Sequence, residues 1–139
     1  MLNKVFIVGA GQMGLDIGQV MAKAGMKVVF RDMTDEILAK SMAKLNKGLD
    51  KQVAKGKMDE AAKAAILANI STTTELAPAA DADLVLEAIV ENIEIKKNLF
   101  KELDGICKPE CIFATNTSSI SITQIAAATN RADKFIGMH

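Results

Sequence analysis

The sequence predicts an α/β fold with a doubly wound parallel sheet of about six strands, flanked by helices on both faces. Short apolar runs rich in β-branched residues alternate with longer segments of helical periodicity along the whole chain. Nearly every position within these runs is apolar, which is typical of parallel strands buried on both faces. With 139 residues, 50% of them hydrophobic, the chain has the size and composition of one domain, which we assign to residues 1–139.

Six runs carry the strand pattern and five segments between them carry the helical pattern. The predicted strands span 5–8, 28–30, 70–74, 84–89, 112–115 and 135–138, and the predicted helices span 13–24, 34–55, 59–68, 92–104 and 121–129. Gly25 suits the end of the first helix because glycine readily takes the left-handed conformation there. Pro78 and Pro109 fall in connections. The hydroxyls of residues 118–121 are expected to cap the last helix.

Charge and cysteine content exclude several classes of protein. The 17 lysine and arginine residues balance the 17 aspartate and glutamate residues, whereas nucleic-acid binders usually carry a basic excess. Charged residues interrupt every apolar stretch before it reaches the roughly 18–20 residues of a membrane span, and the first residues run directly into a strand pattern rather than a signal peptide. Cys107 and Cys111 are too few for a disulfide scaffold and are expected to be packing residues. We therefore expect a cytoplasmic protein with no nucleic-acid or membrane partner.

A glycine motif lies between the first predicted strand and the first predicted helix. In Gly9-Ala10-Gly11-Gln12-Met13-Gly14, the first glycine permits a tight turn and the second lets the backbone approach a pyrophosphate. The third allows the helix to pack closely on the strand, and Gly18 extends that contact. The helix N-terminus presents unpaired N–H groups and a partial positive charge to phosphate. The motif and its context indicate a dinucleotide site of the Rossmann type.

An acidic residue at the end of the second predicted strand strengthens this interpretation. Asp32 follows Gly14 by 18 residues, where a carboxylate accepts hydrogen bonds from the adenosine ribose. The same carboxylate would repel a 2′-phosphate, so NAD is favoured over NADP. Strand alternation is expected to direct the neighbouring Arg31 away from Asp32. A tight turn followed by an unrelated surface aspartate is the structural alternative.

A lysine stripe follows one face of the second predicted helix. At about 100° per residue its members fall within an arc of roughly 80°, opposite an apolar stripe. The lysines are Lys40, Lys44, Lys47, Lys51 and Lys55, and the apolar residues are Leu38, Met42, Leu45, Leu49 and Val53. The stripe is either a solvated face or a contact for a polyanionic ligand such as coenzyme A. Gly48, in the middle of this helix, is a weak helix former and is a candidate position for a bend or a break.

Polar residues gather after several predicted strands, where ligands of open α/β sheets bind. These groups are 9–14, Asp32, 88–91, 115–119 and His139, with Lys96 one turn into the following helix. His139 is the single histidine, so a metal site is not expected. Histidine exchanges a proton near neutral pH, as oxidation of a hydroxyl to a ketone requires, but a structural role stays open. Ser118 has no histidine near it in sequence, which argues against a serine hydrolase.

Five motifs in order resemble a known family. They are 9–14 (GAGQMG), Arg31-Asp32, 87–91 (EAIVE), 116–119 (NTSS) and 137–139 (GMH). The chain resembles, over essentially its full length, the NAD-binding domain of 3-hydroxyacyl-CoA dehydrogenases, most closely the bacterial 3-hydroxybutyryl-CoA dehydrogenases. The resemblance implies reversible hydride transfer between C3 of a (3S)-3-hydroxyacyl-CoA and NAD, with acyl-CoA as substrate.

The resemblance also implies roles for individual residues. His139 matches the catalytic histidine that takes the proton from the 3-hydroxyl, Ser118 matches a serine that hydrogen-bonds the substrate oxygen, and Asn116 matches a residue near that oxygen. Glu91 and Lys96 match residues near the nicotinamide ribose. Cofactor contacts are implied for Gly9, Gly11, Gln12, Met13, Gly14, Asp32, Ala88, Glu91, Lys96, Asn116 and Ser118. Contacts to CoA are implied for Lys51, Lys55 and Ser118.

One departure from the family follows His139. In the family a Phe-Phe-Asn-Pro segment, a glutamate that orients the histidine and a helical domain come next, and none of these is in this sequence. The chain is therefore expected to bind NAD but to be catalytically impaired by itself, and the full-length protein is expected to be a homodimer. Two alternatives stay open: a β-hydroxyacid dehydrogenase of the 3-hydroxyisobutyrate or 6-phosphogluconate type, and a non-catalytic NAD-binding module.

Overall fold

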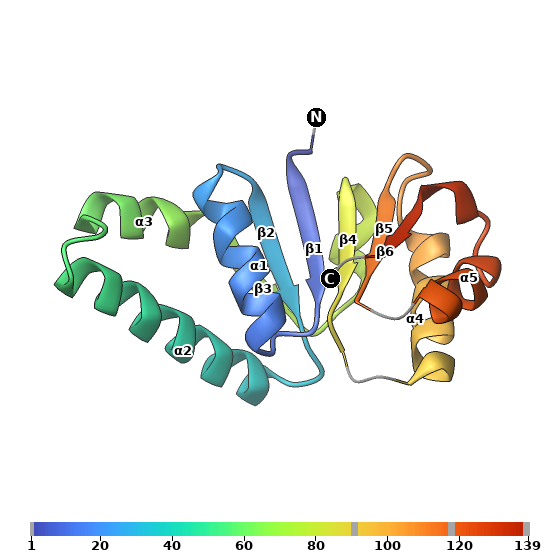
Figure 1. Ribbon diagram of the computed structural model, residues 1–139, viewed down its shortest axis with the longest axis horizontal. Coiled ribbons are helices and arrows are strands. Elements are labelled where there is room, and N and C mark those ends of the chain that lie inside the picture. Colours follow the sequence, from blue (N-terminus) through green and yellow to red (C-terminus); the bar gives the residue numbers. More distant parts are fainter. Residues whose placement is uncertain (1, 90–91, 117–118, 138–139) are drawn as a thin grey trace.

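The computed structural model describes residues 2–89, 92–116 and 119–137, and within them the chain forms one parallel sheet with helices on both faces (Figure 1). The strands are β1 (Lys4–Val8), β2 (Lys27–Arg31), β3 (Ile70–Thr73), β4 (Leu84–Glu87), β5 (Ile112–Thr115) and β6 (Phe135–Gly137). The helices are α1 (Gln12–Lys23), α2 (Asp35–Ala54), α3 (Glu60–Ala68), α4 (Ile93–Ile106) and α5 (Ser119–Ala127), with 3-10 turns η1 (Ala77–Asp81) and η2 (Ala132–Lys134). The predicted fold class is confirmed.

The strand order is β3-β2-β1-β4-β5-β6, and every neighbouring pair is parallel. The chain therefore winds outward from β1 to β3, returns to the centre at β4, and winds outward in the other direction to β6. In such a sheet the loops after the two central strands diverge and leave a crevice at their carboxyl ends. That crevice lies here between β1 and β4.

Alternation along the strands separates two hydrophobic cores. Val5 and Ile7 of β1 face a cluster that includes Leu15 of α1 and residues of α2 and α3. Phe6 and Val8 face the opposite cluster, which includes Phe100 of α4 and residues of α5. Figure 1 shows the same division, with α1, α2 and α3 on one side of the molecule and α4 and α5 on the other. A strand with apolar residues on both faces is thus fixed from both sides.

The edge strands differ from the prediction that strands are buried on both faces. All four residues of β4 are buried, whereas Ser71 and Thr72 in the middle of β3 are both exposed. At the other edge, Phe135 is buried but Ile136 and Gly137 are exposed. An edge strand has one neighbour and incomplete helical cover, so it needs fewer apolar residues.

Local signals set the ends of the first two helices. Gly25 adopts φ +98°, and the Met26 N–H donates to the Met21 carbonyl oxygen at 3.1 Å, which closes α1 as predicted. The Thr34 hydroxyl accepts from the Ile37 N–H at 3.2 Å at the start of α2. The helix does not break at Gly48, because α2 continues from Asp35 to Ala54 without interruption. The apolar stripe buried beneath it outweighs one weak helix former.

Arg131 joins the C-terminal elements to α4. Its Nε lies 2.6 Å from Asp104 Oδ1, and its terminal nitrogens donate to the carbonyl oxygens of Asp104, Cys107, Lys108 and Cys111 at 2.8–3.3 Å. The guanidinium carbon lies 4.5 Å from the centroid of the Phe113 ring. The Asp104 and Cys107 carbonyls lie at the end of α4, so one side chain bonds that helix end and fixes the turn to β5.

The remaining expectations about packing are met where the structure describes them. Pro78 lies in the first turn of η1 and Pro109 lies in the turn before β5. Cys107 and Cys111 are both buried free thiols. Ser118, one of the expected capping residues, lies outside the described residues, and α5 begins at Ser119. No helix within the described ranges is long and apolar enough to cross a membrane.

Candidate cofactor-binding site

The turn from β1 to α1 packs so tightly that two of its positions require glycine. Gly9 has φ +108°, and a Cβ built on it would lie 2.4 Å from the carbonyl oxygen of Ala88. A Cβ on Gly14 would lie 2.1 Å from the carbonyl oxygen of Gly9. The loop after β1 is therefore held against the end of β4 on one side and against α1 on the other.

Gly11 differs from these two glycines, because a Cβ there would meet no atom within 4 Å. It faces open space at the N-terminus of α1, which begins at Gln12. In the part of the chain that the structure describes, no side chain caps this terminus, so its first N–H groups are available to an anion. Gln12 donates to Asp16 Oδ1 at 2.7 Å, and Met13 is exposed on the first turn. This geometry fits a pyrophosphate that approaches the backbone at Gly11.

Asp32 lies directly after β2 and faces the same turn. Its Oδ2 accepts from the Ala10 N–H at 2.9 Å, and its Oδ1 accepts from the Met33 N–H at 2.8 Å. The carboxylate is half-buried at the edge of a cavity. Each carboxylate oxygen accepts more than one hydrogen bond, so both keep capacity for ribose hydroxyls. The structure thus brings the predicted acid and the glycine loop together.

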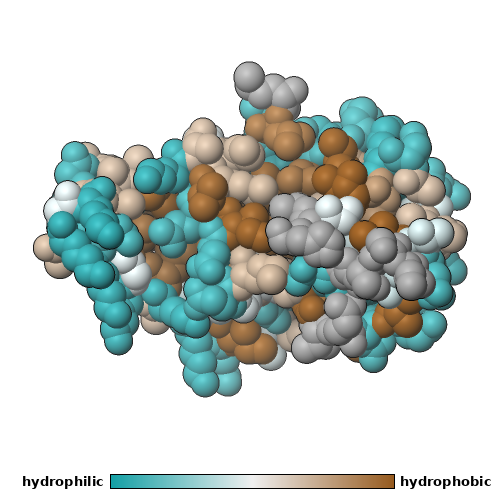
Figure 2. Space-filling view, viewed as in Figure 1, coloured by the Kyte–Doolittle hydropathy of each residue, from teal (hydrophilic) through white to brown (hydrophobic). Residues whose placement is uncertain are grey.

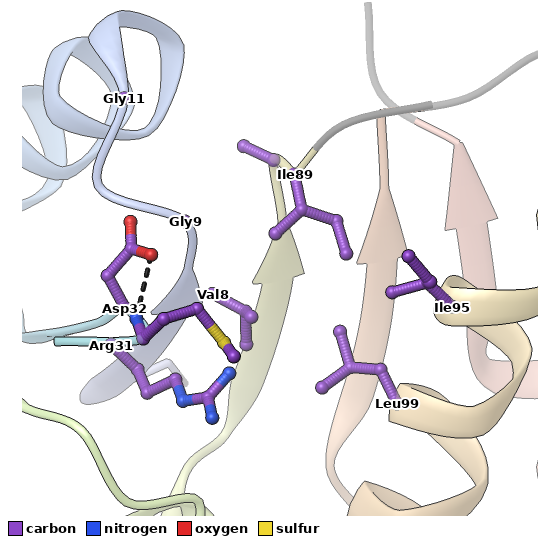
Figure 3. A pocket seen from close by; sticks show the side chains of 10 residues that line it. Val8, Gly9, Gly11, Arg31, Asp32, Ile89, Ile95 and Leu99 are labelled. Atoms are coloured by element: carbon purple, nitrogen blue, oxygen red, sulfur yellow. Dashed lines mark hydrogen bonds between the residues drawn. The ribbon is translucent and has the colours of Figure 1, made fainter. Parts of the chain in front are cut away.

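The cavity beside Asp32 measures about 450 Å³ and lies at the crevice between β1 and β4 (Figure 3). Ile89, Ile95 and Leu99 form an apolar wall, and Arg31, Asp32 and Met33 line the side next to β2. Figure 3 shows the Arg31 guanidinium directed away from the Asp32 carboxylate, as strand alternation predicts. The Arg31 Nε donates to the Thr74 carbonyl oxygen at 3.1 Å. An apolar slot beside a carboxylate suits a flat base attached to a ribose.

A buried polar cluster adjoins the apolar wall through the backbone of Ile89. Lys96 Nζ is 3.2 Å from Glu87 Oε1 and 3.2 Å from the Asn116 carbonyl oxygen, and neither the Lys96 nor the Glu87 side chain has exposed surface. Glu87 Oε2 accepts from the Ile89 N–H at 2.7 Å, and the Thr115 hydroxyl donates to Glu87 Oε1. The cluster connects the end of β4, the end of β5 and the second turn of α4.

The residues predicted for catalysis and cofactor binding divide into three groups. Gly9, Gly11, Asp32 and Ala88 line the cavity, and Gln12, Met13 and Gly14 form the first turn of α1 beside it. Lys96 and Asn116 lie in the buried cluster, with the Lys96 ammonium facing Glu87 rather than the cavity, so their cofactor contacts stay predictions. Glu91, Ser118 and His139 lie outside the described residues, and their roles also stay predictions.

The five lysines predicted as a stripe are all exposed; four lie on α2, opposite the buried residues Leu38, Leu45 and Leu49, and Lys55 is the C-cap residue of that helix. Figure 2 shows the hydrophilic side chains along this helix. A groove of about 370 Å³ between α1 and α2 is lined by Lys44, Lys47 and Lys51, together with Gln12 and Asp16. The amphipathic pattern is confirmed, whereas contact with a polyanion stays a prediction.

Two polar residues near the site had no role assigned from the sequence, although Glu87 stands in the 87–91 motif. Glu87 interrupts an apolar run, Leu84 to Ile89, and a carboxylate inside a buried strand is itself a signal of a paired charge. Ser41, on the buried side of α2, donates to the Ala10 carbonyl oxygen at 2.7 Å. This bond connects α2 to the glycine loop. No periodicity in the sequence distinguishes that serine from others.

The fold and site define a dinucleotide-binding domain of the Rossmann type: a doubly wound parallel sheet, a glycine turn at the first helix and an acid at the end of β2. The family described as "3-hydroxyacyl-CoA dehydrogenase, NAD binding domain" matches residues 4–139. The chain belongs to this family, and its cofactor is NAD.

Individual relatives agree with this assignment. The chain is 48% identical over 136 residues to 3-hydroxybutyryl-CoA dehydrogenase of Clostridioides difficile, covering 98% of this chain and 48% of the relative. The crystal structure of (S)-3-hydroxybutyryl-CoA dehydrogenase from Ralstonia eutropha superposes with TM-score 0.95 at 45% identity, covering 100% of this chain and 49% of that one. The 3-hydroxybutyryl-CoA dehydrogenase of Escherichia coli superposes with TM-score 0.96 at 35% identity, over 100% of this chain and 29% of that one. The chain thus spans about half the length, or less, of these relatives.

Proposed function

We propose that the protein containing this domain interconverts (3S)-3-hydroxyacyl-CoA and 3-oxoacyl-CoA, with 3-hydroxybutyryl-CoA as the favoured substrate. The observation that carries the proposal is the position of Asp32, whose carboxylate joins the glycine loop to the cavity at the switch point of the sheet. The relatives named above are 3-hydroxybutyryl-CoA dehydrogenases, which supports the choice of substrate class.

The residues of this chain bind and orient the cofactor. Asp32 would accept hydrogen bonds from the adenosine ribose, the backbone at Gly11 and the N-terminus of α1 would hold the pyrophosphate, and Ile89 and Ile95 would exclude water from one face of the base. When bound, NAD supplies the acceptor for a hydride from C3 of the substrate. Holding two reactants in fixed geometry removes much of the entropic barrier to their reaction.

Proton transfer and CoA binding rest on the family resemblance. We assign to His139 the removal of the proton from the 3-hydroxyl, and to Ser118 and Asn116 the hydrogen bonds to that oxygen. Lys51 and Lys55 would contact the phosphates of CoA from the exposed face at the end of α2. A homodimeric whole protein in the cytoplasm also belongs to this proposal.

A chimera tests the proposed activity. Residues 1–139 are joined to the part of the C. difficile relative that lies beyond the matched region, and NADH oxidation is followed with acetoacetyl-CoA. We expect turnover by the chimera, a loss of at least about 100-fold in the His139→Ala chimera, and little turnover by residues 1–139 alone. Reduction of NAD with 3-hydroxyisobutyrate as the substrate tests the alternative class of β-hydroxyacid dehydrogenase, and we expect no turnover in that assay. A chimera that folds and binds NADH but does not reduce acetoacetyl-CoA would contradict the proposal.

A further inference from the structure

The buried cluster behind the cavity joins segments that face the cofactor. Glu87 holds the backbone of Ile89, which lines the cavity, and pairs with Lys96, which in turn donates to the Asn116 carbonyl oxygen. The Asn116 N–H donates to the Glu87 carbonyl oxygen at 3.2 Å. Ala88, between Glu87 and Ile89, is the residue against which Gly9 packs. One ion pair therefore links the loops after β1, β4 and β5.

Stability of the fold does not by itself account for this pair. Glu87 and Lys96 are the two charged side chains, of those in the described ranges, that have no exposed surface. Removing two charges from water is costly, and well-packed apolar residues of similar volume often serve as well or better. An apolar pair could hold β4 against α4, but it could not bond the Ile89 N–H or the Asn116 carbonyl oxygen.

The position of the cluster relative to Asp32 indicates which half of the cofactor it serves. A dinucleotide lies across the carboxyl ends of the strands at the switch point, with its adenosine ribose at the end of β2. Strand order then runs from β2 through β1 to β4 and β5. The half of the cofactor that carries nicotinamide must therefore lie above the ends of β4 and β5, where Lys96 and Asn116 meet.

We infer that Glu87 is a positioning residue for the nicotinamide half of the site, acting through Lys96 and through the backbone at Asn116. This inference rests on NAD binding by the domain. The pair fixes the ends of β4 and β5 relative to each other before the cofactor arrives, so binding costs less ordering of these loops. Asp32 and Gly11, which serve the other half of the cofactor, make no contact with this pair among the hydrogen bonds of the described residues.

The test compares NADH with AMP, which carries only the adenosine half. The variant is Glu87→Gln with Lys96→Met: glutamine keeps an acceptor for the Ile89 N–H, and methionine avoids a buried charge without a counterion. The matched control is Glu94→Gln with Lys97→Met, an ion pair of 3.7 Å on the exposed face of the same helix. Affinities for both ligands are measured by calorimetric titration of the 139-residue chain, alongside equilibrium unfolding.

We expect the Glu87→Gln/Lys96→Met variant to bind NADH about ten-fold more weakly than the unchanged chain and to bind AMP within about two-fold of it. The control should alter neither affinity. Loss of affinity for both ligands in equal proportion, or for neither, would overturn the inference, because a purely structural pair has no reason to discriminate between them. The fluorescence anisotropy of bound NADH should also fall in the variant.

Two further outcomes remain informative. Because the resemblance also places Lys96 near the nicotinamide ribose, Thr115→Val, which removes the hydroxyl bond to Glu87 and keeps Lys96, is titrated in the same way, and it also serves if the double variant does not fold. A smaller shift of the NADH-to-AMP ratio in the same direction supports the inference, and an unchanged ratio overturns it. If the unchanged chain is folded and binds neither NADH nor AMP, the cofactor assignment fails and the inference fails with it. If the unchanged chain binds both ligands, only the role of Glu87 is at issue.

Discussion

Asp32 Oδ2 accepts a hydrogen bond from the Ala10 N–H at 2.9 Å, which joins the end of β2 to the glycine loop after β1. The carboxylate to which we assign the ribose is therefore also part of the scaffold that holds the loop. The second oxygen is fixed by the Met33 N–H, so the carboxylate plane is set before a ligand arrives. Recognition of the ribose and the shape of the pyrophosphate loop are coupled through one side chain.

Substituting Asp32 should change both affinity and cofactor preference. We expect Asp32→Ala to raise the dissociation constant for NADH at least about ten-fold, or about 1.4 kcal/mol, because ribose and Ala10 both lose an acceptor. Asp32→Asn keeps one acceptor oxygen and should lose less affinity, while NADPH binding should improve relative to NADH as the negative charge disappears. NADH fluorescence titrations measure both effects. An unchanged ratio of NADH to NADPH affinity in Asp32→Asn would contradict the assigned role.

The glycines of the turn offer a matched pair of variants. Gly11→Ala introduces a methyl group into open space at an ordinary backbone conformation, so we expect normal stability and weaker NADH binding. Gly9→Ala combines φ +108° with a contact of 2.4 Å to Ala88, so we expect a loss of at least about 2 kcal/mol in the free energy of unfolding. Urea denaturation and NADH titration of both variants separate the two effects. Equal loss of stability in both would show that Gly11 is also structural.

Much of the fold could be predicted because the local and global signals agree. The six strands and five helices predicted from alternation all appear, and Gly25 correctly predicted where α1 ends. β3 departs from the buried pattern because it lies at the edge, and edge position is decided by strand order rather than by local sequence. The continuity of α2 through Gly48 depends on the buried stripe beneath it, which outweighs the propensity of one residue.

The candidate site was predictable where one short segment carries it and not where several segments meet. The glycine turn and Asp32 are recognised from their spacing. The Glu87–Lys96 pair and the apolar wall of Ile89, Ile95 and Leu99 arise from the packing of α4 on β4. Sequence spacing does not report which side chains meet across two such elements.

Arg131 should be essential for stability although it lies far from the cavity residues in the sequence. We expect Arg131→Met to lower the free energy of unfolding by about 3 kcal/mol, because it leaves the half-buried Asp104 carboxylate without its cation and removes the donors to the Asp104 and Cys107 carbonyl oxygens at the end of α4. Lys134→Met, which removes an exposed bond to the Pro109 carbonyl oxygen, is the control and should cost less than about 1 kcal/mol. Similar losses in the two variants would argue against the capping role.

The stability of the domain should decrease in acid. Lys108 beside Asp83, together with the N–H groups of Asn3 and Lys4, holds the pKa of the Asp83 carboxyl well below its usual range. Burial alone would raise the pKa of Asp104, but the Asn130 N–H and the Arg131 guanidinium reverse this, so its pKa is also lowered.

Groups with a depressed pKa in the folded state stabilise it above the unfolded value, about 3.9 for aspartate, and this contribution disappears as pH falls toward the folded pKa. We therefore expect the free energy of unfolding to be level near neutral pH and to fall below about pH 4. Asp83→Asn should lower stability at pH 7 and flatten the fall. Urea denaturation at a series of pH values measures this, and a fall of unchanged steepness in the variant would contradict it.

The exposed lysines of α2 give a separate test of the substrate assignment. In the active chimera, Lys51→Gln with Lys55→Gln should raise the KM for acetoacetyl-CoA several-fold at low ionic strength, with the KM for NADH unchanged. Lys23→Gln with Lys101→Gln, which removes two exposed positive charges away from α2, serves as the control for net charge. A stripe that is only solvated would show no difference between the two variants.

A parallel titration of the 139-residue chain with NADH and with NADPH tests the central claim most directly. The chain has no tryptophan or tyrosine, so the fluorescence of the reduced nicotinamide is observed without interference. We expect NADH binding in the micromolar range, about 8 kcal/mol, and clearly weaker binding of NADPH. A folded chain that binds neither cofactor, or that prefers NADPH, would contradict the assignment of Asp32 and the glycine turn as an NAD site.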